Sequence, residues 1–173
     1  MCLTATKTQA ADTSSGLRGV TAADVDFVLQ HVRSADFVEW QLMCPAPTFD
    51  LRSMIIESVN GSAFSASAYY GDQIVVILGI TQPQPESNTA KIWAIGTTAL
   101  ERPEVYMRWV KASIQIIETF GKQFERLENV VHEKNKKAIR YLRHLDFEFT
   151  EPAVTIKNEV FLPFHKTAVK VQA

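Results

Sequence analysis

The spacing of hydrophobic positions divides this chain into helical and extended stretches. Hydrophobic residues recur at intervals of three and four over residues 25–32, directly after a T-x-x-D capping pattern at Thr21 and Asp24. This pattern predicts a first helix. Residues 51–59 show the same spacing after a capping residue, and Asn60-Gly61 is expected to end this further helix.

The middle of the chain has the pattern of strands. Residues 63–70 and 73–80 flank Gly71-Asp72, which predicts a β-hairpin. The second of these runs is apolar on both faces, so we expect it in the middle of a sheet. A polar loop over residues 81–89 leads to the next expected strand, residues 91–97.

The last third of the chain alternates between helix and strand patterns. Helical spacing over residues 103–121 predicts the longest helix, beginning at a proline and ending at a glycine. Residues 127–149 then predict a strand, a helix and a second short aromatic strand. Residues 154–162 form either one bent strand or a second hairpin around Lys157-Asn158.

Length and composition fit one domain. The chain has 173 residues, of which 46% are hydrophobic, enough for one core and too few for a second full domain. We expect this domain over residues 16–162. Residues 1–15 are polar and small and are expected to form a flexible arm, and residues 163–173 are treated as a C-terminal tail.

Charge and cysteine content exclude several classes of protein. The formal net charge is −1, which gives no general attraction to nucleic acid or to an anionic membrane. No apolar run reaches the roughly 18 residues of a membrane span. Cys2 and Cys44 are too few for a disulfide framework or a zinc site. We therefore expect two free thiols, no metal site and a cytoplasmic environment.

The order of elements and one motif resemble a known superfamily. Val131, Asn135, Ala138 and Phe147 occupy the places of a valine, asparagine, alanine and phenylalanine pattern in the GNAT superfamily of acetyl-CoA-dependent N-acetyltransferases. The resemblance covers roughly residues 17–162. It implies an α/β (α+β) fold with a mixed, mostly antiparallel central sheet of about six or seven strands, flanked by about four helices.

A narrower resemblance lies within that fold. Residues 56–58, 92–97 and 127–131 are similar to the small internal virion or head-morphogenesis proteins of short-tailed phages, the podoviruses. This resemblance implies a viral protein that acts in virion assembly through contacts with other phage virion proteins. It places the chain in the virion or the host cytoplasm and allows a homo-oligomer.

The loop expected to hold the cofactor departs from the GNAT pattern. Members of the superfamily hold the acetyl-CoA pyrophosphate on backbone amides in a glycine-containing loop before the long helix. Residues 97–108 contain no glycine, and Glu101 and Glu104 place negative charge there. We therefore expect no cofactor, or acetyl-CoA only if the chain is an active enzyme. The candidate cofactor-binding residues are Thr97, Thr98, Arg102 and Asn135.

The candidate catalytic residues are His132, Glu133 and Tyr141. His132 and Glu133, at the end of a predicted strand, either deprotonate an amine or form an exposed polar strand end. The tyrosine that serves many GNAT enzymes as general acid aligns with Leu142. Tyr141 is one residue early, about 100° away around a helix, and is expected to pack or contact solvent. Asp146 replaces a glycine and tolerates the left-handed conformation.

Two charged groups and the tryptophans have two interpretations each. Arg33, Asp36 and Glu39 line the acceptor side of a cleft or belong to a solvated helix face. The basic residues within 134–144 form a solvated face or bind a partner, and nucleic acid is unlikely without interleaved aromatic residues. The tryptophans belong to the core or anchor an assembly surface: Trp40, Trp93 and Trp109.

The sequence leads to a main hypothesis and two alternatives. The main hypothesis is a phage virion or assembly protein with a degenerate acetyltransferase fold. The first alternative is an active acetyl-CoA-dependent N-acetyltransferase with His132 or Glu133 as base, and the second is a non-catalytic protein that binds a host factor. An open cleft between residues 91–97 and 127–132 favours the enzyme, and a plugged cleft favours the structural protein.

Overall fold

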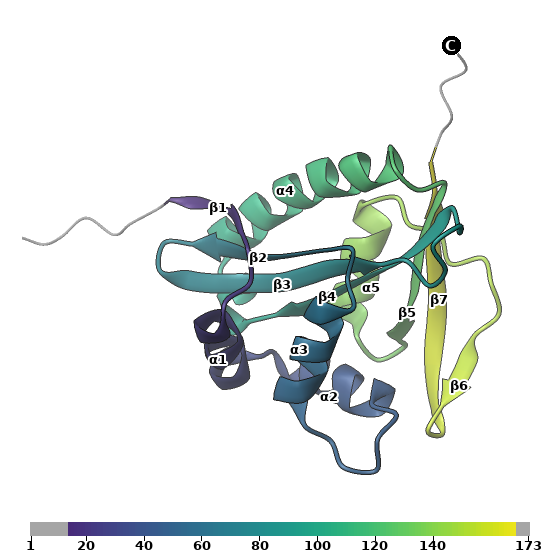
Figure 1. Cartoon of the computed structure of the whole chain (residues 1–173), viewed down its shortest axis with the longest axis horizontal. Helices are drawn as coiled ribbons and strands as arrows, with labels where there is room; N and C mark the ends of the chain where they lie inside the picture. Colours follow the sequence, from purple (N-terminus) through teal and green to yellow (C-terminus); the bar gives the residue numbers. More distant parts are fainter. Residues whose placement is uncertain (1–13, 169–173) are drawn as a thin grey trace, which may run out of the picture.

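A twisted seven-stranded sheet forms the centre of the computed structural model, which describes residues 14–168 (Figure 1). Every neighbouring pair is antiparallel except β4 and β5, which run parallel. The predicted mixed, mostly antiparallel sheet is confirmed. In order across the sheet, the strands are β1 (Ser15–Arg18), β2 (Phe64–Tyr70), β3 (Gln73–Thr81), β4 (Thr89–Gly96), β5 (Arg126–His132), β7 (Glu159–Thr167) and β6 (Val154–Ile156).

Five α-helices cover the two faces of this sheet within residues 14–168. On one face lie α1 (Ala22–His31), α2 (Ser34–Met43) and α3 (Leu51–Asn60), and on the other lie α4 (Pro103–Gly121) and α5 (Lys136–His144) (Figure 1). A short 3-10 turn, η1 (Thr98–Glu101), precedes α4. The structure has one helix more than expected because Val32 and Arg33 are extended and separate α1 from α2.

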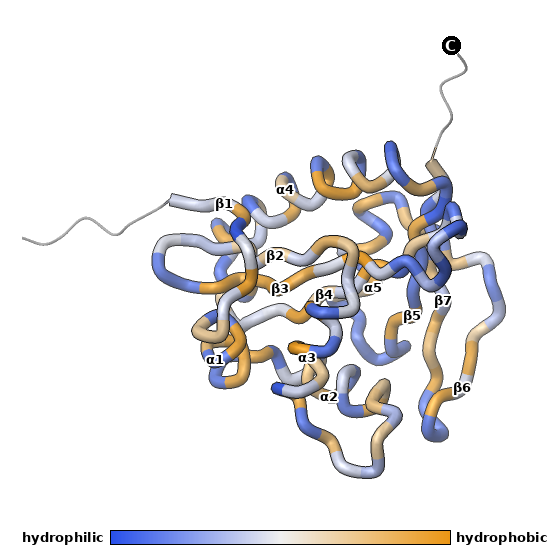
Figure 2. The backbone as a smooth tube through the Cα atoms, viewed as in Figure 1, coloured by the Kyte–Doolittle hydropathy of each residue, from blue (hydrophilic) through white to orange (hydrophobic). Residues whose placement is uncertain are grey.

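The hydrophobic core lies on both faces of β3. Val76, Leu78 and Ile80 pack toward α4, whereas Ile74 and Ile77 pack toward α1 and α3. This confirms the prediction that the strand is buried on both faces. Figure 2 shows mostly hydrophobic residues along the central strands and an alternation of hydrophobic and hydrophilic residues along α4. Each fully buried aliphatic side chain stabilises the fold by roughly 1.5–3 kcal/mol.

The beginning of α1 is tied to the sheet by one buried carboxylate. Asp24 accepts a hydrogen bond from the Thr21 amide at 2.9 Å, and Thr21 caps the helix in return, so the predicted capping pattern is confirmed. The same carboxylate accepts a hydrogen bond from Ser67 Oγ on β2 at 2.8 Å and pairs with Arg18 on β1. Asp24 therefore joins two strands and a helix while only 2% of its surface is exposed.

Three tight turns have the backbone that the sequence predicts. Gly71 has a φ of 61° between β2 and β3. Lys157 and Asn158 have φ values of 48° and 63°, which is the geometry of a two-residue hairpin turn, so residues 154–167 form the second hairpin and not a bent strand. Asp146, at the end of α5, has a φ of 61° and adopts the left-handed conformation expected of it.

Three predicted boundaries are wrong. The second aromatic strand near Phe149 is absent from the structure, where Glu148 makes only an isolated bridge to His165. The sheet does not end at residue 162, because β7 continues to Thr167 and pairs with β5 along that length. Ser15, the last residue assigned to the predicted arm, is the first residue of β1. The remainder of the arm (1–13) and of the tail (169–173) lies outside the described residues.

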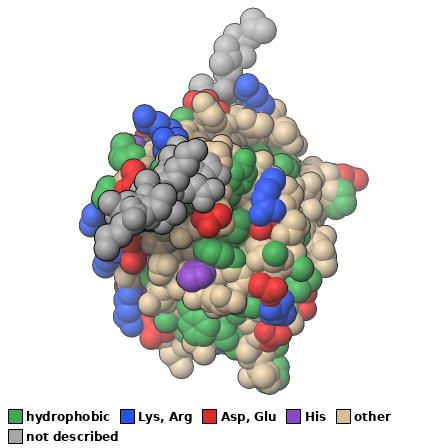
Figure 3. Space-filling view, turned by 90° about the vertical axis from the view of Figure 1, so that its left-hand side faces the viewer, with side chains coloured by type: hydrophobic (Ala, Val, Ile, Leu, Met, Phe, Trp, Pro, Cys, Tyr) green, Lys and Arg blue, Asp and Glu red, His purple; other side chains and the backbone are tan. Residues whose placement is uncertain are grey.

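Within residues 14–168, none of the helices is long and apolar enough to cross a bilayer. On the face drawn in Figure 3, lysine and arginine side chains are interspersed with aspartate and glutamate side chains, in keeping with the small net charge.

We predict that the Asp24→Ala substitution lowers the free energy of unfolding by about 2–4 kcal/mol, because it leaves Ser67 and the Thr21 amide without their acceptor. The matched control is Asp26→Ala on the same helix, which removes an exposed pair with Arg52 and should cost less than about 1 kcal/mol. Urea unfolding measures both. Equal losses would contradict the role given to Asp24.

Candidate active site

A cleft opens where β4 and β5 separate. The two strands pair only from Thr89 with Arg126 to Lys91 with Glu128, and beyond these residues they diverge. A cavity of about 850 Å³ occupies the gap and reaches residues on both faces of the sheet. This volume lies in the range of small-molecule and cofactor sites. The cleft is therefore open and not plugged by side chains, which is the arrangement that favours the enzyme over the structural protein.

Side chains from neighbouring elements form hydrogen bonds with the backbone groups of β4 that face the gap. Alternate residues of a strand direct their amide and carbonyl groups to the same side, so Ile92, Ala94 and Gly96 face the cleft. Asn129 Nδ2 donates to the Ile92 carbonyl at 2.6 Å, and Trp40 Nε1 donates to the Ala94 carbonyl at 3.3 Å. These contacts replace the missing strand pairing and stabilise the separation of β4 from β5.

Asp36 joins α2 to the end of β4. Its carboxylate accepts hydrogen bonds from Arg33 at 2.9 Å and from the Gly96 amide at 2.7 Å, and only 6% of its surface is exposed. The Arg33 amide donates in turn to the Gly96 carbonyl. Of the two interpretations of this charged group, the structure supports the cleft, because a solvated helix face would leave these side chains in water.

Glu39 lies one turn further along α2 and lines the cleft. Burial raises the pKa of this carboxyl group to about 7, and the charge of Asp36 adds to the rise. Hydrogen bonds from Asn135 Nδ2, at 2.9 Å, and from the main chain of His132 oppose it. A carboxyl group that titrates near neutral pH inside a cleft can accept a proton and release it again, as a general base must.

Asn135 connects this carboxylate to α5. Its Oδ1 accepts a hydrogen bond from the Ala138 amide at 3.3 Å and so caps the helix, while its Nδ2 donates to Glu39. Asn135, which belongs to the scaffold motif of the sequence, therefore also fixes the position of the Glu39 carboxyl group. Asn135 is one of the four predicted cofactor-binding residues, and it lines the cleft.

Tyr141 forms part of the cleft wall toward α4. Its hydroxyl donates to Ser113 Oγ at 2.6 Å, and its ring stacks on Trp109 with centroids 6.4 Å apart. Burial raises the pKa of the phenol, so it keeps its proton at neutral pH. Tyr141 packs as expected and is mostly shielded from solvent. Leu142, which aligns with the tyrosine of the superfamily, is buried and also lines the cleft.

His132 and Glu133 are not among the residues that line the cleft. His132 is buried, lies 3.2 Å from Glu159 and packs against Phe161 on β7. It is therefore not an exposed strand end either. Glu133 follows it at the end of β5, where its amide donates to the Val160 carbonyl. The structure does not bring these two predicted bases into the cleft, where Glu39 is a lining residue instead.

Three of the four predicted cofactor-binding residues also lie outside the cleft. Thr97 is fully buried, donates to the Ile74 carbonyl at 2.7 Å and caps η1, which is a structural role. Thr98 is exposed. Arg102 bonds Gln73 at 2.9 Å and lies over the ring of Tyr70. Neither Thr98 nor Arg102 belongs to the lining.

Two basic residues of α5 lie instead beside the first turn of α4. Glu101 of η1 and two residues of the first turn of α4, Pro103 and Tyr106, line the cleft, and Lys137 and Arg140 line it from α5. Lys137 Nζ is 3.8 Å from Glu101, and Arg102 is 4.0 Å from Glu104. The acidic residues at this helix end are therefore partly neutralised.

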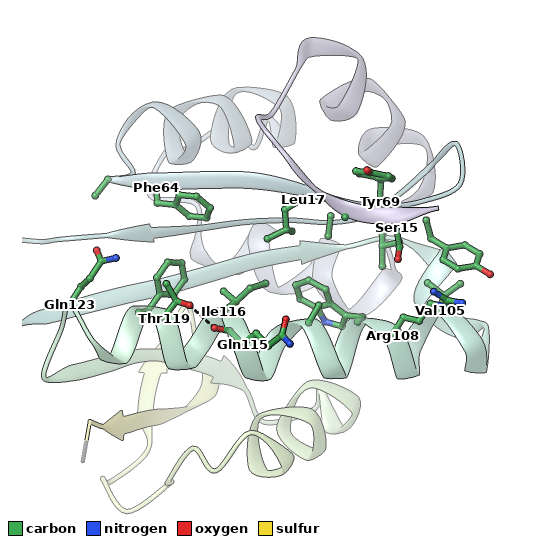
Figure 4. Close-up of a pocket in the computed structure, with 18 residues that line it drawn as sticks. Ser15, Leu17, Phe64, Tyr69, Val105, Arg108, Gln115, Ile116, Thr119 and Gln123 are labelled. Carbon is green, nitrogen blue, oxygen red and sulfur yellow. Dashed lines mark hydrogen bonds between the residues drawn. The ribbon is translucent and has the colours of Figure 1, made fainter. Parts of the chain in front are cut away.

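A second hollow, of about 670 Å³, lies between α4 and the β1 and β2 strands. Figure 4 shows Leu17 and Phe64 on the sheet side of it and Ile116 and Thr119 on α4. Among the described residues that line it, Arg108 is the only charged one. It offers no acid or base for catalysis. No group of three potential metal ligands occurs within residues 14–168.

The chain was compared with known families, sequences and structures. No protein-family model matches it, and no curated protein sequence matches it significantly. A GNAT-family acetyltransferase from Bacillus anthracis matches with a TM-score of 0.66 and 11% identity, over 91% of this chain and 96% of that one. An N-acetyltransferase from Staphylococcus aureus Mu50 matches with a TM-score of 0.64 and 12% identity, over 91% and 100% of the two chains.

A spermidine N-acetyltransferase from Vibrio cholerae, solved in complex with CoA and spermine, has the same architecture. Its TM-score is 0.59 at 11% identity, over 89% of this chain and 95% of that one. At such low identities these matches establish the fold and leave the activity open.

The prediction of a phage virion or assembly protein is wrong. The three matching structures named above are acetyltransferases, and none of the comparisons links the chain to a virion family. The segments that carried the resemblance to virion proteins include β4 and the first residues of β5, whose apolar pattern the core requires. The comparisons favour the alternative, an N-acetyltransferase. The chain has the fold of the GNAT acetyltransferases.

Proposed function

We propose that this protein is an acetyl-CoA-dependent N-acetyltransferase that uses Glu39 as its general base. The observation that carries the proposal is a partly buried carboxyl group, with a pKa of about 7, in the cleft between the two diverging strands. The fold supports it, because the matched structures include acetyltransferases. The Vibrio cholerae relative is named for an amine substrate, which supports an amine acceptor.

The residues of the cleft fit acetyl-CoA. The cavity runs from the first turn of α4, through the gap in the sheet, to α2 and α3 on the other face, so a long ligand can pass between the strands. The positive end of the α4 dipole favours an anion at the mouth. The loop before α4 has no glycine to bring its backbone amides close to the phosphates. Lys137 and Arg140 supply positive charge at this mouth instead.

Each side chain of the site has a distinct task in this proposal. Bound acetyl-CoA supplies an acetyl group activated as a thioester. Ionised Glu39 accepts a proton from the ammonium group of the acceptor, which leaves a neutral amine with a free electron pair. Asn135 holds the Glu39 carboxylate in place, and Arg33 neutralises Asp36 beside it. Tyr141 keeps its proton and fixes α5 against α4 through Ser113.

We predict that Glu39→Gln lowers kcat/KM for acetyl transfer about 100- to 1,000-fold and leaves the affinity for acetyl-CoA within about twofold, because only the base is lost. The wild-type rate should rise about tenfold per pH unit below pH 7 and level off above it. Calorimetry measures binding, and a thiol-release assay measures turnover. Glu133→Gln is the control and should keep full activity. Failure of the wild type to bind acetyl-CoA would overturn the proposal.

A charge reversal tests the mouth of the cleft. Lys137→Glu and Arg140→Glu should each weaken acetyl-CoA binding about tenfold at low salt, because each places a negative charge where the phosphates would lie. Lys136→Glu, an exposed residue of the same helix that is not part of the lining, is the matched control. An equal loss in all three variants would indicate a nonspecific effect of net charge.

The titration of Glu39 also has a consequence for stability. Because burial raises its pKa from 4.5 to about 7, the folded chain holds a proton that the unfolded chain has lost between these values, so the free energy of unfolding falls as pH rises through this range. The difference in free energy of unfolding between Glu39→Gln and the wild type should therefore shift in favour of the variant by about 2 kcal/mol as the pH rises from 5 to 8. Urea unfolding at both pH values measures this gain. Glu133→Gln should show no such difference.

A further inference from the structure

The acceptor side of the cleft, defined here as the part lined by α2, α3 and the Trp93 face of β4, carries two tryptophans. Trp40 of α2 meets Trp93 of β4 edge to face, with ring centroids 5.8 Å apart and planes at 77°. The indole of Trp93 lies over Gly79 of β3, where an added Cβ would come within 2.5 Å of it. The glycine therefore makes the space in which Trp93 lies against the sheet.

Both indole rings are held in place by hydrogen bonds to the protein. Trp93 Nε1 donates to Ser62 Oγ at 2.9 Å, and Trp40 Nε1 donates to the Ala94 carbonyl at 3.3 Å. The rings consequently offer carbon surface and π faces to a ligand, and no donor. Met43 and Met54 extend this apolar surface along the same side of the cleft.

The charges around this surface suit a ligand with a single positive charge. Among the described residues that line the cleft, the acids are Asp36, Glu39 and Glu101. Asp36 is bound by Arg33 and the Gly96 amide, and Glu101 lies at the far mouth beside Lys137. Lys91, two residues from Trp93 and so on the same face of β4, adds positive charge there. A polyamine would bring further ammonium groups to a surface that has one available carboxylate.

Resting on the proposed function, we infer that the acceptor is a primary monoamine that carries an aromatic or bulky apolar group. Its ammonium group approaches Glu39, and its apolar group lies against Trp40 and Trp93. Stacking and cation–π contact with such rings typically strengthen binding about tenfold. A free arylalkylamine and the amino terminus of a peptide with an aromatic first residue share this chemistry.

Binding without cofactor tests this inference separately from activity. Calorimetry at pH 8 compares 2-phenylethylamine, ethylamine, spermidine and phenylalanyl-glycinamide, first with the protein alone and then with CoA present, which has no acetyl group to transfer. We expect 2-phenylethylamine or the dipeptide amide to bind at least tenfold more tightly than ethylamine and spermidine. The stronger of the two aromatic ligands identifies the source of the amine.

Variants locate the effect on the tryptophans. Trp40→Leu and Trp93→Leu should each weaken binding of the aromatic amine about tenfold, and Phe64→Leu in the second hollow should leave it unchanged. Ser58→Asp adds a carboxylate to the cleft lining and should strengthen spermidine binding severalfold, which keeps the test open if a tryptophan variant fails to fold.

The outcomes separate this inference from the proposed function. Acetyl transfer to spermidine in preference to 2-phenylethylamine would overturn the inference and leave the acetyltransferase in place. Binding of 2-phenylethylamine that depends on both tryptophans, in a protein that does not bind acetyl-CoA, would overturn the proposed function and support the acceptor surface. Equal affinity for ethylamine and 2-phenylethylamine would overturn the inference directly.

Discussion

The separation of β4 from β5 depends on the hydrogen bonds that complete the free edge of β4. Unpaired backbone groups in a partly buried gap cost about 1–3 kcal/mol each, so an open edge would favour continued pairing of the two strands. The side chains of Asn129, Trp40 and Asp36 bond that edge in place of the β5 backbone. The cleft is thus a stable part of the fold, because closing it would break three side-chain contacts.

The same contacts position the chemistry. Asp36 anchors α2 to the end of β4, and Glu39, one turn later on the same helix, is thereby directed toward Asn135. Arg33 neutralises Asp36, so the two neighbouring carboxyl groups do not both present free negative charge. If the anchor moved, the environment that raises the pKa of Glu39 would move with it. The end of β4 and the proposed base Glu39 are therefore coupled through a single helix of ten residues.

The features that depend on neighbouring residues could be predicted from the sequence, and those that depend on distant contacts could not. The cap at Thr21 is local and was predicted, and the turn at Lys157-Asn158 was one of the two alternatives that the local pattern allows. The burial of Glu39 depends on Asn135, 96 residues away, and its spacing from Asp36 alone is also that of a solvated helix face. His132 is a candidate base because it ends a strand, but its side chain contacts Glu159 and Phe161 of β7 and does not line the cleft.

The narrow ends of the sheet limit how this protein can associate. Within residues 14–168 the outermost strands are β1, with four residues, and β6, with three. A strand added at either edge would gain only a few backbone hydrogen bonds, and long exposed edges are the usual template for intermolecular pairing. Within the described residues, the two outermost strands therefore give little backbone for the addition of another strand.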